Sequence, residues 1–266
     1  MEVKKTGKIH YLEPGQIVRS GVAVAGFTTR HEGVSRPPYH SLNLGTNTLD
    51  PPANVKGNRS LLARSFGTRL ERLVTVTQVH GTDLLVIDTP NADLDHFRKI
   101  ECDGIVTNQP EVMIAIGVAD CLPILLLDPQ RRVAAALHAG WQGTAGGIAE
   151  KGVKALRELF GSEPAELLAA LGPGIGACCY EVDEKVRDAF RAKDREWEPV
   201  ARGTGPGKWR LDLAAANRQQ LLAAGVSPER LEESGQCVAC TPATFYSYRR
   251  DGGDTGRQVG FIMLRP

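Results

Sequence analysis

The sequence predicts an α+β fold, with a mixed sheet at its centre and helices outside it. Apolar and β-branched runs of strand length recur along the chain, and amphipathic segments of helical period lie between some of them. The order of these elements is too irregular for a doubly wound βαβ fold. No low-complexity linker interrupts the 266 residues, so we expect a single domain over residues 1–266.

The predicted strands share a high content of Val, Ile and Leu, or of small residues. One or two strands are predicted at 17–30, before a polar loop at 31–55 whose length is typical of a binding segment. Further strands are predicted at 70–81, 83–89, 112–119, 121–128, 132–140, 167–176 and 256–264.

Four segments have the pattern of helices. The first, at 55–67, has Asn54 as a candidate N-cap. The second, at 144–161, has Thr144 near its start and Gly161 at its end, where a C-terminal glycine is favoured. The third and fourth are amphipathic segments at 183–193 and 212–226.

Composition narrows the class of function. The net charge is +1 and acidic and basic residues are interspersed, so the sequence lacks the concentrated positive charge that binds nucleic acid or an anionic membrane. The longest apolar run, 112–119, is too short to cross a bilayer, and no secretory signal is recognised. We therefore expect a cytoplasmic, monomeric protein with small-molecule substrates. Its six cysteines are expected to be thiols, ligands or nucleophiles rather than disulfides.

Three side chains at the ends of predicted strands form a candidate metal site. His80 ends one strand, Cys121 lies between two apolar runs, and His138 ends another. Two imidazoles and a thiolate are good zinc ligands, and three protein ligands with one open position are typical of catalytic zinc. A buried cysteine and strand-end histidines are also common core residues, so spacing alone leaves both interpretations open.

The sequence resembles the family variously called multicopper polyphenol oxidase (laccase-domain), YfiH-like or peptidoglycan editing factor proteins. The matching motifs follow the family's order over nearly the whole chain. They are FTTRHEGVSRPPYHSLNLG, NRSLL, TQVHG, VADCLPILLLD, LHAGWQGTAGGI, LGPGIGACCYEV and FYSYRRDGGDTGRQ.

This resemblance implies an α/β/β/α sandwich similar to the deamidating, cytotoxic necrotizing factor-like toxin domain. It implies that His80, Cys121 and His138 hold a catalytic zinc, with copper as a second candidate metal. It also implies phosphorolysis of adenosine, inosine and methylthioadenosine, with adenosine deaminase activity in addition, so purine nucleoside and phosphate are the expected partners. Cys102 stands where the family more usually has alanine, and adds a thiol near the site.

Four polar residues are candidates for substrate binding. Arg59 and Arg249 are candidate cationic anchors for phosphate, and Asn43 and Gln78 are candidate partners of the ribose or the base. The start of the helix predicted near Thr144 offers a second anion site. Zinc lowers the pKa of a bound water to near neutrality, as deamination requires, whereas phosphorolysis needs an anion held against the anomeric carbon.

Several other functions use the same residues. A His₂Cys set also suits copper, but a multicopper laccase needs more histidines than the six in this chain, His10, His31, His40, His80, His96 and His138. A cysteine hydrolase would use Cys121 as nucleophile with His138 or His80 as base. A hydrolase that edits peptidoglycan precursors could use either this dyad or the metal, and a non-enzymatic binding module is the remaining class.

A second group of cysteines also has the composition of a metal site. Cys237 and Cys240 form a CxxC motif, and Cys178 and Cys179 are adjacent to each other. Together they are a candidate structural zinc site, although the two pairs lack matched spacing, and buried thiols are the alternative.

Overall fold

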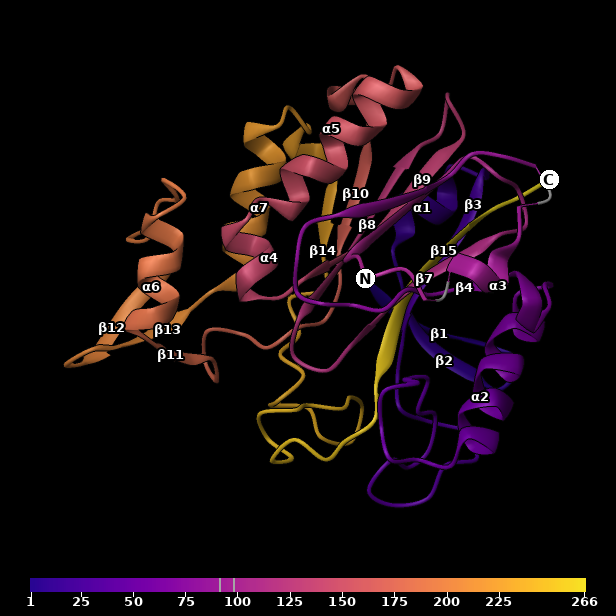
Figure 1. The fold of residues 1–266 in the computed structure, drawn as a ribbon, viewed down its shortest axis with the longest axis horizontal. Coiled ribbons are helices and arrows are strands. Elements are labelled where there is room, and N and C mark those ends of the chain that lie inside the picture. Colours follow the sequence, from indigo (N-terminus) through magenta and orange to yellow (C-terminus); the bar gives the residue numbers. More distant parts are fainter. Residues whose placement is uncertain (91, 98) are drawn as a thin grey trace.

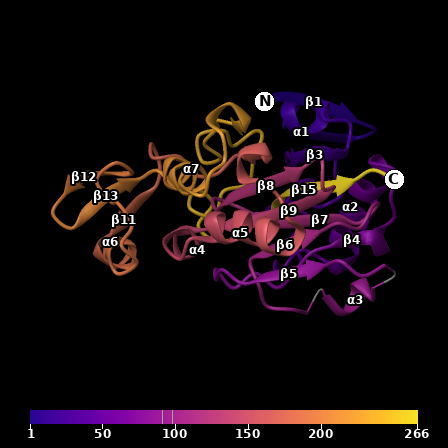
Figure 2. The ribbon, with the colours of Figure 1, turned by 90° about the horizontal axis from the view of Figure 1, so that it is seen from above.

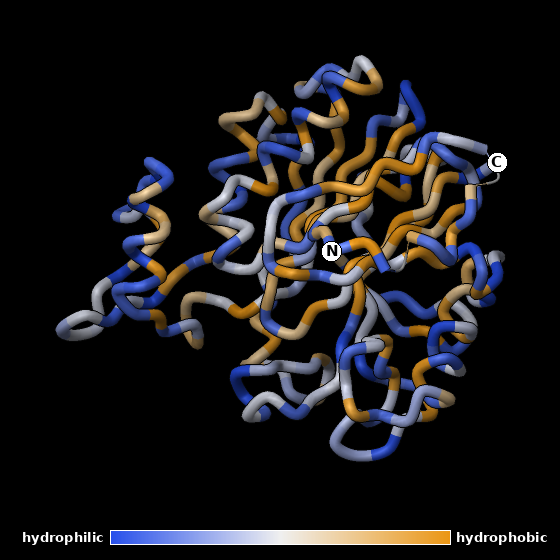
Figure 3. The backbone as a smooth tube through the Cα atoms, viewed as in Figure 1, coloured by the Kyte–Doolittle hydropathy of each residue, from blue (hydrophilic) through white to orange (hydrophobic). Residues whose placement is uncertain are grey.

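The computed structural model describes residues 1–90, 92–97 and 99–266, and two six-stranded sheets form its centre (Figure 1). Both sheets contain parallel and antiparallel neighbours. Their inner faces share one hydrophobic cluster, which includes Ile114 and Ile262 from one sheet and Leu125 and Ala136 from the other. Figure 3 shows that the central strands are mostly hydrophobic. The predicted α+β class with mixed sheets is confirmed.

The strands of each sheet are given in spatial order. The first sheet consists of β1 (Glu2–Thr6), β2 (Ile9–Glu13), β3 (Ala23–Thr28), β15 (Gln258–Leu264), β7 (Met113–Val118) and β4 (Leu73–Val74). The second consists of β14 (Leu231–Glu233), β10 (Leu168–Leu171), β8 (Leu122–Asp128), β9 (Val133–Ala139), β6 (Gly104–Thr107) and β5 (Leu84–Ile87). A three-stranded antiparallel sheet contains β11 (Glu181–Asp183), β13 (Lys208–Leu211) and β12 (Ala201–Gly205).

Helices cover the outer faces of both large sheets (Figures 1 and 2). α2 (Pro52–Ser65) packs on the first sheet through Leu62. α5 (Ile148–Phe160) and α7 (Leu213–Ala223) pack on the second sheet, α5 through Ile148 and Val153. The layers therefore follow the α/β/β/α order that the resemblance implies. The shorter helices are α1 (Gly15–Arg19), α3 (Leu94–Phe97), α4 (Trp141–Ala145) and α6 (Glu184–Arg191). Within the described ranges, no helix has the length and hydrophobicity of a membrane span.

The helix predicted at 144–161 is two helices, α4 and α5. Gly147 has a φ of 81° between them, a left-handed conformation that interrupts a helix, and Gly161 ends α5 at a φ of 68° as predicted. Thr144 lies inside α4, where its hydroxyl and carbonyl accept hydrogen bonds from Asn217 and Gln220. The helix therefore begins at Trp141, three residues earlier than predicted, and the anion site expected at its start stays a prediction.

Two other predicted boundaries also differ. α2 begins at Pro52, because proline fits the first turn of a helix, so Asn54 lies in that turn and donates to Asp50 instead of acting as N-cap. The strand predicted at 70–81 reduces to β4. Beyond β4, the Gln78 side chain takes the place of sheet pairing, because its amide exchanges two hydrogen bonds, of 2.8 and 2.9 Å, with the backbone of Gly117.

Candidate active site

The β8–β9 hairpin and the segment after β4 bring the three predicted metal ligands together. Within the hairpin, Pro123 is paired with His138, so Cys121 just before β8 lies beside the end of β9. His80 comes from the segment that follows β4. The ligand atoms of His80, Cys121 and His138 all lie within 4.8 Å of one another. Residues that are separated in sequence thus form one candidate centre at the ends of two central strands.

Asp103 orients this centre. Its carboxylate is fully buried and lies 2.7 Å from Nδ1 of His138. It also accepts backbone N–H bonds from Val79, His80 and Gly81 at 3.2, 2.9 and 2.6 Å. One carboxylate therefore fixes the ring of His138 and the backbone of His80. A carboxylate behind a ligating imidazole is the usual support of a metal site, because it fixes the tautomer that presents Nε2 to the metal.

The protonation of the cluster follows from these contacts. Burial raises the pKa of Cys121, but the neighbouring His138 and His80 outweigh it and lower that pKa to about 6. Burial lowers the pKa of His138, but the Cys121 thiolate and Asp103 raise it to about 9. Although burial raises the pKa of Asp103, the bond to His138 and the backbone N–H groups hold it below its usual value. The cluster therefore stabilises a thiolate, the form of cysteine that binds metals and attacks electrophiles.

The backbone around the centre is adapted to the close approach of its side chains. A Cβ at Gly140 would lie 2.9 Å from Sγ of Cys121 and 3.1 Å from Cδ2 of His80, so only glycine fits. His80 and Asp120 have φ values of 61° and 92°, in the left-handed region that non-glycine residues seldom adopt. Asp120 is held there by bonds of 2.6 Å from the Ser247 hydroxyl and from the Arg249 backbone. Strained residues next to a ligand are typical of functional sites.

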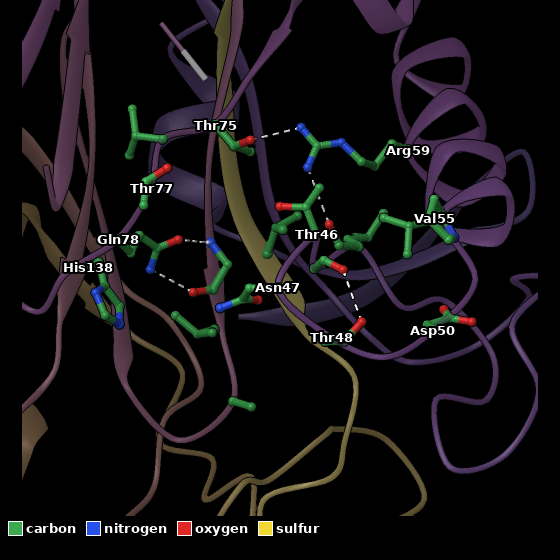
Figure 4. A pocket seen from close by; sticks show the side chains of 18 of the residues that line it. Thr46, Asn47, Thr48, Asp50, Val55, Arg59, Thr75, Thr77, Gln78 and His138 are labelled. Carbon is green, nitrogen blue, oxygen red and sulfur yellow. Dashed lines mark hydrogen bonds between the residues drawn. The ribbon is translucent and has the colours of Figure 1, made fainter. Parts of the chain in front are cut away.

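A cavity of about 460 Å³ opens beside the centre (Figure 4). His80 and His138 line one end of it. One wall comes from α2 and the loop before it, and the opposite wall comes from the segment after β4 and the end of β7. Its size falls in the usual range for small-molecule sites, roughly 300–1,000 Å³.

Residues 24–265 match the family model described as multi-copper polyphenol oxidoreductase laccase. The chain belongs to this laccase-domain, YfiH-like family. Purine nucleoside phosphorylase YlmD of Geobacillus stearothermophilus is 42% identical over 248 residues, which are 91% of this chain and 90% of that protein. Purine nucleoside phosphorylase YfiH of Escherichia coli is 37% identical over 244 residues, covering 92% and 94% of the two chains.

Solved structures give the same relationship. The crystal structure of the Bacillus licheniformis hypothetical protein YfiH superposes with a TM-score of 0.90 at 35% identity, over 99% of each chain. The structure of YlmD from Geobacillus stearothermophilus also has a TM-score of 0.90, at 38% identity over 99% of this chain and 98% of that one. The family and the fold inferred from the sequence motifs are thus confirmed.

Two of the four predicted substrate residues line the cavity of this laccase-domain chain. Arg59 is buried, and its guanidinium donates to the carbonyl of Leu44 at 3.4 Å and to the hydroxyl of Thr75 at 2.8 Å, so it joins the two walls and is not a solvated helix side chain. Gln78 faces the cavity near His138, with its amide bound to Gly117 (Figure 4). Their contact with a substrate stays a prediction.

The other two predicted residues do not line this cavity. Asn43 is fully buried, and its side chain donates to Thr48 and Asp50 and accepts from the backbone of Gly45 and Arg257. It therefore orders the loop that faces the cavity. Arg249 is exposed and stacks over the Tyr180 ring at 5.2 Å.

Sequence reasoning missed three residues of the site. Asp103 directly precedes the apolar β6 segment, but its charged neighbours give no local signal of burial. Lys56 lines the cavity and is exposed, one turn before Arg59 on α2. Burial holds the pKa of Arg257 below its ordinary value, while the nearby Cys121 thiolate raises it, so this half-buried arginine also lies near the centre. No local motif marks Lys56 or Arg257.

The donor set of the centre fits zinc or copper. One thiolate, two imidazoles and an orienting carboxylate form a coherent site for either metal. The histidines do not form the larger sites of a multicopper oxidase, because among the described residues only His80 and His138 belong to a group of three or more candidate ligands. His10 and His31 are paired with each other, with ring centroids 5.7 Å apart. The described histidines thus support one mononuclear site at most.

Proposed function

We propose that this chain is a purine nucleoside phosphorylase that acts in the cavity beside the centre, with one zinc held by His80, Cys121 and His138. The proposal rests on the position of the centre: two of its three candidate ligands, His80 and His138, line one end of a cavity large enough for a small-molecule ligand. The relatives that bear the name purine nucleoside phosphorylase match about nine-tenths of the chain, which supports the same activity here.

The cavity has the chemistry that a nucleoside and a phosphate require. Aliphatic side chains on its walls suit the flat faces of a purine, and they are Val55, Leu70, Val76, Val118 and Val259. Polar groups of Thr46, Asn47 and Thr48 can hydrogen-bond a ribose. Lys56 and Arg59 place two positive charges on one wall, where an anion would be attracted.

Phosphorolysis breaks the bond between C1′ of the ribose and the purine nitrogen and forms a bond from C1′ to a phosphate oxygen. The purine leaves with the electron pair and takes up the proton that the attacking hydrogen phosphate gives up. Lys56 and Arg59 would hold the phosphate against C1′. Asp103 keeps the Nδ1 proton of His138 in place and so leaves Nε2 as a ligand. Zinc, when bound, supplies a Lewis acid at this end of the cavity.

The small number of carboxylates on the cavity walls favours phosphorolysis over adenosine deamination. Nucleobase deaminases use a glutamate beside the metal as general acid and base. Among the described residues that line the cavity, Asp50 is the one carboxylate, and it accepts hydrogen bonds from Ser35, Asn43 and Asn54. Deamination is therefore proposed as a minor activity, whose product from adenosine would be inosine instead of adenine.

The decisive experiment incubates the zinc-loaded protein with adenosine or inosine and phosphate. Chromatography should show free base and ribose 1-phosphate in equal amounts, with no turnover when phosphate is omitted. Inosine formed from adenosine without phosphate would make deamination the main activity. If no nucleoside is consumed but a serine-containing muropeptide precursor is hydrolysed, the proposal is wrong and the editing hydrolase is correct. Oxidation of a phenol only after copper loading would instead indicate the oxidase.

Arg59→Lys tests the role of the buried arginine. Lysine keeps the charge but cannot hold both walls and a phosphate through one planar group. We expect the KM for phosphate to rise about tenfold or more, as for the loss of one strong hydrogen bond to a charged group. Zinc content and the thermal midpoint are measured alongside. A lower midpoint with an unchanged KM would make the role of Arg59 structural.

A further inference from the structure

Four cysteines outside the candidate active site gather at one point. Cys178 and Cys179 follow the glycine-rich turn after β10, and Cys237 and Cys240 lie between β14 and β15. All four Sγ atoms lie within 4.8 Å of one another, although about 60 residues separate the two pairs in sequence. Together with the His80 centre, this is one of the two groups of candidate metal ligands among the described residues.

The distances suit a tetrahedral thiolate site. Sγ of Cys240 lies 3.5 Å from Sγ of Cys178 and 3.3 Å from Sγ of Cys179. Four sulfurs around one zinc, each about 2.3 Å from the metal, would lie about 3.8 Å apart. A disulfide needs its two sulfurs at about 2.05 Å. Small shifts of these side chains would therefore form the zinc site. Cys178 and Cys240 are exposed, so an ion has a path of entry.

The backbone around Cys237 is arranged for a thiolate. The N–H of Gly176 lies 3.2 Å from Sγ of Cys237. A backbone N–H directed at the sulfur favours the thiolate form, which is the form that binds a metal ion.

The cluster joins two loops that also meet through the backbone and through Arg249, which stacks over Tyr180. Residues 234–257, between β14 and β15, contain no helix or strand, and a loop of this length needs support inside an ordered domain. Besides the sulfurs, an isolated bridge between Gly174 and Cys237 connects it to the turn after β10. A Cβ at Gly176 would lie 3.2 Å from Cβ of Cys237, so the two loops are in close contact at this point.

We propose that Cys178, Cys179, Cys237 and Cys240 together bind one zinc ion, which cross-links the turn after β10 to the loop before β15. This second site is structural, because four protein ligands leave no open position for a substrate. The same two loops contact Asp120, the neighbour of Cys121: the Ile175 N–H donates to its carbonyl at 2.7 Å, and the Ser247 hydroxyl donates to its carboxylate at 2.6 Å. Binding would release thiol protons and add to the stability of the folded chain.

Zinc analysis of the full chain and four variants tests the proposal. Protein purified under reducing conditions without chelator should contain one more zinc than Cys240→Ser or Cys237→Ser protein. Cys102→Ala removes a buried thiol outside the cluster and should keep this zinc. Cys121→Ala should also keep it, so failure of the proposed catalytic zinc is separable from failure of this site. Equal zinc in the full chain and in Cys240→Ser would overturn the proposal.

A second measurement does not depend on whether a variant folds. Cobalt loaded into the unaltered chain should give a thiolate-to-metal absorption of the strength expected for four sulfurs, far above that of a one-thiolate centre. Alkylation of unfolded protein in chelator without reductant should modify all six cysteines. If two of the four cluster cysteines resist alkylation until reductant is added, the cluster is a disulfide site and the proposal is wrong.

Discussion

The two candidate metal centres differ in what holds their ligands. His138 lies on a strand of the second sheet and Cys121 directly precedes another, while the carboxylate of Asp103 fixes both His138 and the backbone of His80. The four cysteines of the other centre lie on turns and loops, and two of them are exposed. Two ligands on neighbouring strands, with the third fixed by a buried carboxylate, are in place before any metal arrives, whereas a set on loops gains its order from the metal.

This difference assigns different tasks to the two centres. A preorganised centre with an open position can change its fourth ligand during a reaction, because the protein alone maintains its geometry. A four-thiolate centre on loops uses the binding energy of the ion to restrict the chain. The comparison therefore predicts that damage at the first centre affects turnover and damage at the second affects local order.

Cys121→Ala should have the largest effect on activity. Loss of the thiolate removes one of three candidate ligands, so kcat/KM for phosphorolysis should fall at least about a hundredfold, with one zinc lost per chain. Hydrogen exchange in the loop at 234–257 should stay as in the parent. In Cys240→Ser we expect the reverse: kcat/KM should stay near that of the parent, and hydrogen exchange in this loop should be faster. If both variants accelerate exchange there equally, the two centres are not independent.

Asp103→Asn should have the next largest effect. The amide would present an NH₂ group to donors that now meet a carboxylate, so zinc affinity and kcat/KM should each fall about 10–100-fold. The matched control is Asp128→Asn, at the far end of β8, where a buried carboxylate also accepts two backbone N–H bonds, each of 2.9 Å. An equal loss of activity in both variants would show that Asp103 acts through overall stability alone.

The metal-free protein offers a test of the thiolate at the first centre. His138 and His80 lower the pKa of Cys121 to about 6, so it should be about nine-tenths thiolate at pH 7. Its alkylation at pH 7 should be about two- to threefold faster than that of a free peptide thiol, because the larger thiolate fraction is partly offset by the lower nucleophilicity of a low-pKa thiolate, and it should decline only as the pH falls through about 6. Peptide mapping after timed alkylation measures this rate. A midpoint above pH 8 would contradict the thiolate–imidazolium pair.

Lys56→Ala should have the smallest effect, because an exposed charge acts through solvent. The KM for phosphate should rise about two- to fivefold, with kcat nearly unchanged. Lys154→Ala on α5 is the control, since that lysine is 62% exposed and lies on the outer face of the molecule. If raising the ionic strength does not shrink the difference between the two variants, Lys56 does not act through its charge.

The sequence identified the three candidate ligands better than their surroundings. Cys121 and His138 were recognised because long apolar runs located β8 and β9 to within a residue or two. The segment at 75–81 has the composition of a strand, yet only Thr77 forms an isolated bridge, and hydrogen bonds to the side chains of Gln78 and Asp103 take the place of further pairing. Such bonds join residues far apart in sequence, so a local pattern does not reveal them.

The same limit applies to the other misassigned elements. The small sheet at 181–211 was missed because β12 is a largely exposed ARGTG segment without apolar alternation. Asn43 was expected at the substrate, but its bonds to Thr48 and Asp50 become visible only when the loop is folded. The CxxC motif of Cys237 and Cys240 is visible in the sequence, whereas the approach of Cys178 and Cys179 to it depends on how the two loops fold against each other.

The register of the β8–β9 hairpin also determines where the molecule can be altered. Leu122 pairs with Ala139 at the end that carries the active site, and Asp128 pairs with Val133 at the turn. At about 3.3 Å per residue, residues 129–132 lie about 25 Å from Cys121. A fluorophore or affinity tag inserted in that turn would leave the ligand geometry intact. A single residue inserted within β9 would instead rotate His138 to the opposite face of the sheet.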